Sequence, residues 1–576
     1  MQRRNLKVWY QRLANVHRRR PRRRTIAASH PPIGTARRAR SRSWAAVAFA
    51  VLLGTFVRLA HVLSFDFPLN DGGMFLTMTE DLLRSGFALP RYTSYNGLNI
   101  PFAYPPLPFY LAAIATRLTG APLLQLLRFL PAVLSILTIP AFYSLCRALL
   151  RSRIQAAYAV LAFALVPRSF LWLIMGGGLT RAPGFLFAIL MLRETYLLYT
   201  LDEKRRVLTT VLWASLTVLS HPAGAWFAAF SAVVLFLFFG RSRHGLTWSL
   251  LVAGGVLLVT APWWVTVVIR HGLSPLLAAS ETGGYAWYSW VRLLTFDFLE
   301  EAFIGLLSAI GLVGALVCLA DRQWLLPAWL VLIMVLNPRS GGTYATVPLA
   351  VLVGIGLDRV VLFALATDRE DRDSNGSRPE TKKPAEPDVA SARRLQGMLP
   401  KLALSFILLH AVLSALSVGV IRQSSLNVLP SEDQEAMAWL AQNVESQSKF
   451  LLITGAQNWA SDYVSEWFPT LAQRASLATV QGYEWLPRSL FHRQIERYVA
   501  LQECAERDVK CLDDWAAEGG VSFTHVYLHE PWLQVGPGQR QFISFRLRES
   551  LLGSPTYRVI WERRGATVFQ KVQAQR

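Results

Sequence analysis

Long runs of apolar residues recur along this chain of 576 residues and limit its fold more than any other feature. The clearest run, Leu246–Ile269, contains no charged residue and is long enough to cross a bilayer as a helix, which takes about 20 residues. Of the whole chain 53% is hydrophobic and 17% is charged, whereas soluble domains carry about 25% charged residues. The sequence therefore predicts a polytopic α-helical membrane protein and excludes a disordered chain, a collagen-like chain and an ordinary cytosolic enzyme.

We predict eleven membrane-spanning helices in all. A second long stretch, 207–240, also lacks charge, but His221-Pro222-Ala223-Gly224 divides it into two spans joined by a tight turn. Residues 106–119 are too few to cross the bilayer and are predicted to form an interfacial helix. The predicted spans are 44–64, 126–147, 154–175, 181–200, 206–221, 223–240, 246–269, 299–320, 323–337, 343–365 and 400–421.

Positive charge is concentrated at the N-terminus. The chain has 59 Lys and Arg against 37 Asp and Glu, a formal net charge of +22, and residues 1–43 hold 14 Lys and Arg with no acidic residue. A basic segment before an apolar one orients a membrane protein, because positively charged loops stay in the cytoplasm. We therefore predict a basic cytoplasmic tail over 1–43, which for most of its length is a disordered and solvated arm. Contact with anionic membrane lipids is a secondary role, and no nucleic-acid partner is predicted.

The connections between the predicted spans agree with this orientation. Short connections rich in Arg or Lys, such as 147–153 and 241–244, alternate with less basic ones such as 65–125. Since the number of spans is odd, the C-terminus lies outside. The predicted organisation is a tail at 1–43, a transmembrane module at 44–365 with a large first outer loop at 65–125, a cytoplasmic linker at 366–399, a last span at 400–421 and an extracytoplasmic domain at 422–576.

The predicted outer domain mixes helical and strand patterns, which indicates a small α/β unit. A helix is expected at 435–443, and strands are expected at 449–454, 524–528 and 557–561. Cys504 and Cys511 lie close together in this domain, where an extracytoplasmic location permits a disulfide. Whether they pair stays open. No Cys/His spacing typical of zinc, no Walker A, no GxGxxG and no HExxH occurs, so no cofactor is predicted.

The first outer loop carries the main candidate for chemistry. Asp71 precedes Gly72-Gly73, and the glycines let a ligand approach the carboxylate closely. A carboxylate at a membrane surface can act as general base toward a hydroxyl or an amine within hydrogen-bond reach. The alternative is that Asp71 caps the short helix expected at 74–85, since Asp is a favoured cap residue.

Basic residues near the outer ends of the predicted spans form a second set of candidates. Arginine binds phosphate through a two-pronged guanidinium, and an ionisable residue at membrane depth usually faces a polar cavity. Snorkelling to the interface is the alternative for each arginine, and satisfying a turn is the alternative for the histidine. The candidate substrate-binding residues of this kind are Arg58, Arg91, Arg168, Arg181, His221 and Arg339.

Several short motifs extend this pattern. Asp71 stands early in a large first loop, Tyr104-Pro105-Pro106-Leu107 opens a juxtamembrane helix, and Arg128-Phe129-Leu130-Pro131 begins the next span. With the outer domain at 422–576, these features resemble the GT-C superfamily of polytopic glycosyltransferases, which includes protein O-mannosyltransferases, aminoarabinose transferases and oligosaccharyltransferases. The segments 176–181 and 220–224 also resemble bacterial and archaeal members.

The resemblance implies an inverting transferase that uses a polyprenyl-phosphate sugar and acts on a protein, lipid or glycan acceptor in the cell envelope. Asp71 would then be the base, and Arg168, Arg181 and Arg339 would be phosphate contacts. Tyr104 adds a substrate-binding candidate, although it stands where relatives often carry Lys or His. Many relatives pair two acidic residues in the first loop, whereas Gly72 follows Asp71 here. A divalent metal is therefore unsupported.

Two other classes of function remain open. In a transporter, Arg58 and Arg168 would line a pathway, and internal repeats would be expected, but none is found. In a catalytically inactive relative that acts as a membrane scaffold, Gly72 would reflect the loss of an acidic partner. The enzyme differs from both in one expectation, that Asp71, Arg168 and Arg339 converge on one outward cavity that opens to the lipid.

Overall fold

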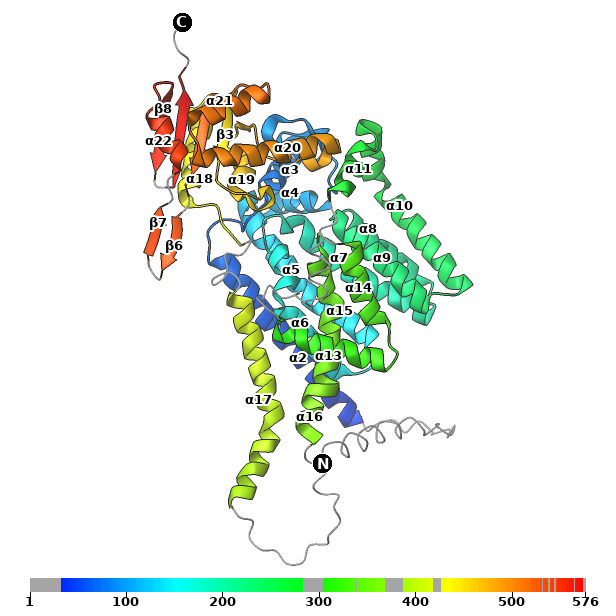
Figure 1. Cartoon of the computed structure of the whole chain (residues 1–576). Coiled ribbons are helices and arrows are strands. Elements are labelled where there is room, and N and C mark those ends of the chain that lie inside the picture. Colours follow the sequence, from blue (N-terminus) through cyan, green and yellow to red (C-terminus); the bar gives the residue numbers. More distant parts are fainter. Residues whose placement is uncertain are drawn as a thin grey trace, which may run out of the picture. The chain divides into compact units, whose positions relative to one another are not determined.

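The computed structural model of the chain is shown in Figure 1. The chain divides into two compact units, Met1–Ala45 and Ala46–Arg576. Of the predicted basic tail, residues 1–32 lie outside the described residues. Side chains are described throughout except at 33–43, 366–367, 387–397, 532–536 and 539–542. The structure describes residues 33–282, 304–337, 339–367, 387–417, 426–530, 532–536, 539–542, 545–563 and 565–572.

Within the described residues, each of the eleven predicted spans overlaps a helix or a series of helical segments, while residues 299–303 and 418–421 of those spans lie outside the described residues. Apolar runs of this length satisfy their backbone groups internally only as helices, which is why the sequence pattern locates them well. The segments are α2 (Ile33–Leu63), α5 (Leu123–Leu149), α6 (Arg153–Leu165) with η2 (Pro167–Ser169) and η3 (Leu171–Leu173), α7 (Gly178–Leu201), α8 (Arg205–Val218), α9 (Pro222–Phe239), α10 (Arg243–His271), α13 (Leu306–Ala320), α14 (Leu325–Leu336), α15 (Gly341–Gly356) with η4 (Leu357–Val361) and α16 (Leu362–Thr367), and α17 (Pro387–Ser417).

Seven helices among the described residues are long and apolar enough to cross a membrane by themselves, and a bent pair would make eight. The pair is α6 with the segment Pro167–Leu173, which turn by 82° where one continuous span was predicted. Pro167 has no N–H to continue the helix and forces Val166 into an extended conformation. The helices α8, α13 and α14 have 14, 15 and 12 residues and are shorter than the hydrocarbon core.

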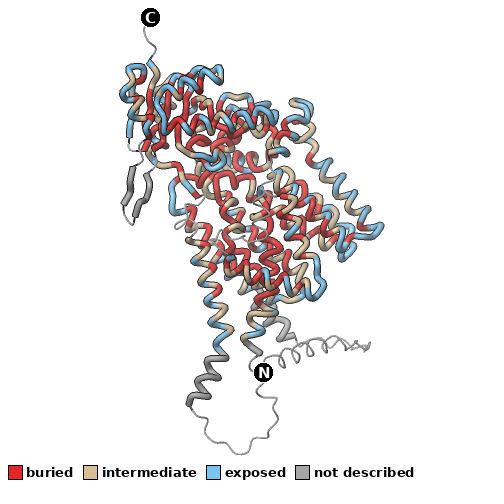
Figure 2. Tube along the Cα trace, viewed as in Figure 1, coloured by how far each residue is buried: buried red, intermediate tan, exposed pale blue. Residues whose placement is uncertain are grey.

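Exposed apolar surface identifies the lipid-facing helices. In the most apolar stretch of each helix, only 11% of the residues of α10 and 17% of those of α17 are buried. The corresponding share is 61% in the helix that begins at Gly341 with α15. Figure 2 shows the same contrast, with α10 mostly pale and α15 mostly red. Apolar helices of this length that protein does not cover need lipid around them. The chain is thus a multi-pass membrane protein.

The last apolar helix begins earlier than predicted. α17 starts at Pro387, inside the predicted linker 366–399, whereas residues 368–386 lie outside the described residues. Pro387 suits the first turn of a helix, and the Ala, Arg, Leu and Gln residues that follow favour helix. The last part of the predicted linker is therefore helical.

The C-terminal part contains the expected α/β domain, and its predicted strands and helix are confirmed. A five-stranded sheet has the order β4-β3-β5-β9-β8, in which β4, β3 and β5 are parallel and β9 and β8 are antiparallel. β6 and β7 form a separate hairpin. The strands are β3 (Lys449–Ile453), β4 (Ala475–Ser476), β5 (His525–His529), β6 (Trp532–Gly536), β7 (Gln539–Phe542), β8 (Tyr557–Arg563) and β9 (Ala566–Lys571).

Helices surround this sheet, and a disulfide joins two of the helical segments. Cys504 in η7 pairs with Cys511 in α21, which resolves the question that the sequence left open. The interior strands are apolar on both faces, as Leu451 and Leu452 illustrate by being fully buried. The helices are α18 (Ser431–Asn443), η5 (Trp459–Ser461), α19 (Tyr463–Leu471), η6 (Tyr483–Trp485), α20 (Arg488–Gln502), η7 (Glu503–Glu506), α21 (Val509–Glu518) and α22 (Arg546–Leu552).

The first outer loop is folded, and it packs on the C-terminal domain. In Figure 1 its helix α3 lies beside α19. The Asn96 amide exchanges two hydrogen bonds with the Ser476 backbone, at 2.9 and 2.7 Å. Its elements are α3 (Gly73–Arg84), β1 (Tyr92–Thr93), η1 (Tyr95–Gly97), β2 (Ile100–Pro101) and α4 (Leu107–Thr119), and α11 (Ser274–Glu281) belongs to the later loop 270–298.

Candidate active site

Asp71 lies in a backbone turn that the protein must hold in place. The flanking residues Asn70 and Gly72 have φ values of 54° and 128°, in the left-handed region that glycine tolerates and other residues adopt less readily. The helix α3 begins after Gly72 with no side-chain cap, so Asp71 does not cap it. A conformation of this kind persists only where surrounding contacts impose it, and two segments supply them here.

The first segment is the glycine run that leads into α7. The Gly177 N–H donates to Asp71 Oδ1 at 2.8 Å, and the Gly176 N–H donates to Leu69 O at 2.9 Å. A Cβ on Gly177 would lie 2.5 Å from Asp71 Oδ2, and a Cβ on Gly176 would overlap the Asp71 carbonyl. The glycines therefore allow the backbone to approach Asp71 closely, which explains their place in the sequence.

The second segment belongs to the C-terminal domain. Trp467 Nε1 donates to Asn70 O at 2.8 Å, and the Gly72 N–H donates to Glu466 Oε1 at 2.8 Å. The Asn70 N–H donates to Asn427 O at 2.7 Å. The Asp71 turn is thus bound from both sides, and the C-terminal domain forms half of its support.

Arg181 forms an ion pair with Asp71. Its Nη2 contacts Asp71 Oδ2, and its Nη1 donates to Trp172 O at 3.1 Å. The guanidinium carbon lies 5.2 Å from the centre of the Trp172 ring. The two side chains are 20% and 16% exposed, so the pair is partly shielded from water but still accessible.

Tyr104 joins the same group of residues. Its hydroxyl lies 3.1 Å from Thr180 Oγ1, one residue before Arg181. Its ring lies 5.0 Å from that of Phe75 and 5.3 Å from that of Trp485. Burial raises the pKa of Tyr104 to about 12, although the nearby cations Arg181 and Arg339 oppose the shift. The phenol is therefore neutral at physiological pH and can donate a hydrogen bond.

Arg339 is an exposed residue just before α15. Burial raises the pKa of Glu484, which lies in η6 of the C-terminal domain, and the Arg339 cation opposes that shift. Arg339 acts in the same way on Tyr104. Arg339 therefore lies near the residues around Asp71 and leaves its guanidinium accessible to an anion.

His221 lies between α8 and α9 and caps α9. Its Nδ1 accepts a hydrogen bond from the Gly224 N–H at 3.1 Å, so the neutral ring carries its proton on Nε2. Burial lowers the pKa of His221 to about 3, and the cations Arg181 and Arg339 add to this effect. The ring is a neutral N–H donor at physiological pH, and its observed contact is the turn role that the sequence gave as one alternative.

Three other predicted arginines have different surroundings. A Cβ on Gly342 would lie 3.6 Å from Arg168 Cδ. Arg168 therefore lies against the first turn of α15, and that turn follows Arg339 closely in the chain. Arg91 is exposed and stacks on Tyr92, which in turn packs on His271. Arg58 is fully buried and binds helix backbone and Ser135. The structure therefore pairs Asp71 with Arg181, with Tyr104 beside Thr180 and the charge of Arg339 acting on Tyr104 and His221, whereas Arg58 and Arg91 have their contacts elsewhere.

Two acidic residues of this site, Glu466 and Glu484, were missed by the sequence analysis. Burial, followed by the charge of Asp71, raises the pKa of Glu466 above its ordinary value. Glu466 lies in the segment Val464 to Phe468, in which every residue is buried and which Glu466 alone supplies with a charge. A lone carboxylate in such a segment was a usable signal of a buried partner.

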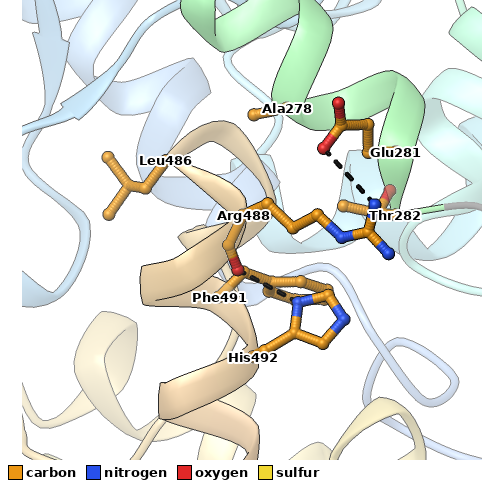
Figure 3. Close-up of a pocket in the computed structure, with 7 residues that line it drawn as sticks. All are labelled: Ala278, Glu281, Thr282, Leu486, Arg488, Phe491 and His492. Carbon is orange, nitrogen blue, oxygen red and sulfur yellow. Dashed lines mark hydrogen bonds and ion pairs between the residues drawn. The ribbon is translucent and has the colours of Figure 1, made fainter.

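The described residues contain no group of three or more His, Cys, Asp or Glu placed to hold a metal ion. A shallow hollow lies between α11 and the start of α20 (Figure 3). Arg488 crosses it toward Glu281 at 3.9 Å, and His492 Nδ1 lies 3.0 Å from Arg488 O. Its wall residue Leu486 follows Glu484 closely in the chain, but none of the predicted site residues lines it.

Comparison with known proteins identifies solved structures with a similar fold. No family model and no curated protein matches the sequence. The structure is similar to the oligosaccharyltransferase AglB of Archaeoglobus fulgidus, solved with an inhibitory peptide and dolichol-phosphate, at a TM-score of 0.59 and 14% identity over 91% of this chain and 80% of that one.

Two further solved structures are similar. ArnT from Cupriavidus metallidurans, solved with undecaprenyl phosphate, matches at a TM-score of 0.52 and 14% identity over 91% of this chain and 98% of that one. The arabinofuranosyltransferase AftD from Mycobacteria matches at 0.52 and 17% identity over 93% of this chain and 40% of that one. The chain has a GT-C-like fold, as the sequence motifs predicted.

Proposed function

We propose that this protein is a membrane glycosyltransferase that moves a sugar from a polyprenyl-phosphate donor to an acceptor on the extracytoplasmic side. The observation that carries the proposal is one outer site where the Asp71 carboxylate meets Arg181, with Arg339, His221 and Tyr104 around it. A general base beside several cationic and neutral donors is what transfer from a phosphate leaving group requires.

In the proposed reaction, Asp71 accepts the proton of an acceptor hydroxyl or amine. The acceptor atom forms a bond to the anomeric carbon from the face opposite the phosphate, so the configuration inverts. The bond between that carbon and the phosphate oxygen breaks, and its electron pair leaves with the polyprenyl phosphate. Arg181 and Arg339 stabilise the developing charge, while Tyr104 and His221 donate hydrogen bonds as neutral groups.

The choice of substrates rests on the structural neighbours. AglB was solved with dolichol-phosphate and a peptide, and ArnT was solved with undecaprenyl phosphate. A lipid-phosphate donor fits the position of Arg339 and Arg181 at helix ends beside the first outer loop. The acceptor is a protein, lipid or glycan, and the sugar is a hexose or a pentose.

The proposed orientation puts the N-terminus in the cytoplasm and the C-terminal domain outside, in the cell envelope. The distribution of basic residues supports it, and so does the Cys504–Cys511 disulfide, because disulfides persist in oxidising compartments. The surroundings of Arg58 do not favour a transport pathway, since this side chain is fully buried in protein.

The test is transfer of a labelled sugar from polyprenyl phosphate to membrane acceptors, with native protein and with Asp71→Asn. The amide keeps the acceptor for the Gly177 N–H but cannot take up a proton, so we expect transfer to fall roughly 100- to 10,000-fold with expression unchanged. Asp321→Asn is the matched control, since it breaks an Asp–Arg pair with Arg359 elsewhere in the molecule. Transfer by Asp71→Asn at the native rate would rule the assignment out, and a native protein without transfer would support the inactive scaffold.

A further inference from the structure

The proposed base is already occupied in this structure. Asp71 Oδ1 accepts the Gly177 N–H at 2.8 Å, and Oδ2 pairs with Arg181 Nη2. The acceptor's proton must reach one of these two oxygens. Proton transfer to Asp71 would also leave the Arg181 cation without its counter-charge in a setting that is only 20% exposed. The paired state therefore opposes the chemistry that Asp71 is proposed to perform.

Arg181 has contacts that keep its guanidinium at the site when Asp71 releases it. Nη1 donates to Trp172 O at 3.1 Å, and the Trp172 ring lies under the cation at 5.2 Å. Arg339, whose charge reaches Tyr104 and His221 together with that of Arg181, is exposed and can bind the same anion. A phosphate between the two arginines would compete directly with the Asp71 carboxylate for Nη2.

We propose that the Arg181–Asp71 ion pair is a latch that the donor phosphate opens, so that the donor binds before Asp71 can deprotonate the acceptor. Arg181 exchanges one anion for another, and the released Asp71 carboxylate becomes free to take up the acceptor's proton. Asp71 Oδ2 then faces the acceptor while Oδ1 keeps the Gly177 hydrogen bond. The latch rests on the proposed function, but it makes a separate statement about binding that can be tested without any transfer.

The test is the affinity of the full-length protein, in phosphatidylcholine nanodiscs, for undecaprenyl phosphate. Asp71→Asn removes the competing anion and leaves Arg181 held by Trp172. We expect this variant to bind undecaprenyl phosphate about two- to fivefold more tightly than native protein, the range for a partly exposed ion pair. Asp321→Asn, the matched control, should bind with native affinity. Unchanged or weaker binding by Asp71→Asn would overturn the latch.

A second variant shows whether Arg181 is the residue released. Arg181→Gln should weaken binding at least about tenfold, and adding Asp71→Asn to it should give no further gain, because the two effects act through one pair. Equal tightening by Asp71→Asn in both backgrounds would overturn the latch. A thermal unfolding curve for each variant confirms that binding is measured on folded protein.

Competing ligands identify the chemistry that opens the pair. Undecaprenol, which lacks the phosphate, should bind Asp71→Asn and native protein equally. Phosphatidylglycerol should also bind the two proteins equally, because we expect that a general lipid phosphate does not open the pair. Inorganic phosphate should compete for both proteins, but more strongly for Asp71→Asn. Tightening for undecaprenol would overturn the latch. Tight binding with transfer retained by Asp71→Asn would instead overturn the proposed base, so the two failures are distinguishable.

Discussion

Two arginines that look alike in the sequence have opposite surroundings in the structure. Arg58 lies within α2, and its side chain is fully buried. It donates to Ser135 Oγ at 2.9 Å and to Ala164 O at 2.9 Å, and it stacks on Phe170 at 4.7 Å. Arg181 has one carbonyl contact, one carboxylate partner and a partly exposed guanidinium.

The difference teaches how to separate a structural cation from a site cation in a membrane protein. Ala164 lies in the last turn of α6, just before the chain turns by 82°, where helix carbonyls lack partners within the helix. Arg58 supplies a donor there and fixes the break. Arg181 instead meets a carboxylate near other accessible charges, and such a contact can be exchanged for a ligand.

Among the tests of this comparison, the largest expected effect is on transfer by Arg181→Met. Loss of a cation that stabilises the leaving phosphate should lower kcat/KM for the donor about 100- to 1,000-fold. Arg359→Met, which breaks the exposed pair with Asp321, is the matched control and should transfer normally. Steady-state assays with labelled donor measure both. Near-native transfer by Arg181→Met would show that Arg181 has no role in transfer.

The next effect is on stability, through Arg58→Met. The substitution removes the hydrogen bonds to Ser135 and Ala164 and leaves the end of α6 without its donor, so we expect a loss of about 2 kcal/mol in unfolding free energy. Thermal unfolding in detergent measures this loss. Transfer per folded molecule should stay within about threefold of native, because substitutions at distant sites affect each other little. A folded Arg58→Met variant that cannot bind donor would show that Arg58, like Arg181, serves the site and is not only structural.

These contrasts also mark how far the sequence could lead. Helix positions follow from apolar runs, and the strands β3, β5 and β8 follow from short runs of β-forming residues, so both were predicted locally. The break at Pro167 was missed because the hydrophobic pattern continues across it. The role of Arg58 was missed because a charge at membrane depth has the same sequence signature whether it binds helix backbone or a ligand.

The site was predictable only in part, for a similar reason. Asp71, Arg181 and Arg339 carry the expected chemistry in their residue types and their positions near span ends. The support from Glu466 and Trp467 comes from about 390 residues further along the chain. Nothing in the local pattern around Asp71 indicates which distant helix will contact it. The second carboxylate, Glu466, could therefore be identified only from the folded structure.

A smaller effect on transfer is expected from Gly177→Ala. The new Cβ would lie 2.5 Å from Asp71 Oδ2 and from Arg181 Nη2, so the pair must shift to accommodate it. We expect transfer to fall about tenfold, because small displacements of catalytic groups have large effects on rate. Gly254→Ala, where nothing lies within 4 Å of the added Cβ, is the matched control. Equal activities of the two variants would show that close packing at Gly177 does not set the position of Asp71.

The smallest effect should appear in the pH dependence of stability, through Glu466. Because burial raises its pKa, folded protein keeps the proton at pH values where the unfolded chain has lost it. The folded state then binds more protons, and stability falls as pH rises from the ordinary glutamate range toward the raised pKa. Glu466→Gln cannot titrate and should remove about 1 kcal/mol of this decline. Glu466→Ala should also flatten the curve but lie lower at every pH, since the Gly72 N–H loses its acceptor. Thermal unfolding between pH 5 and 8 separates the three proteins, and a native slope in Glu466→Gln would place the titrating group elsewhere.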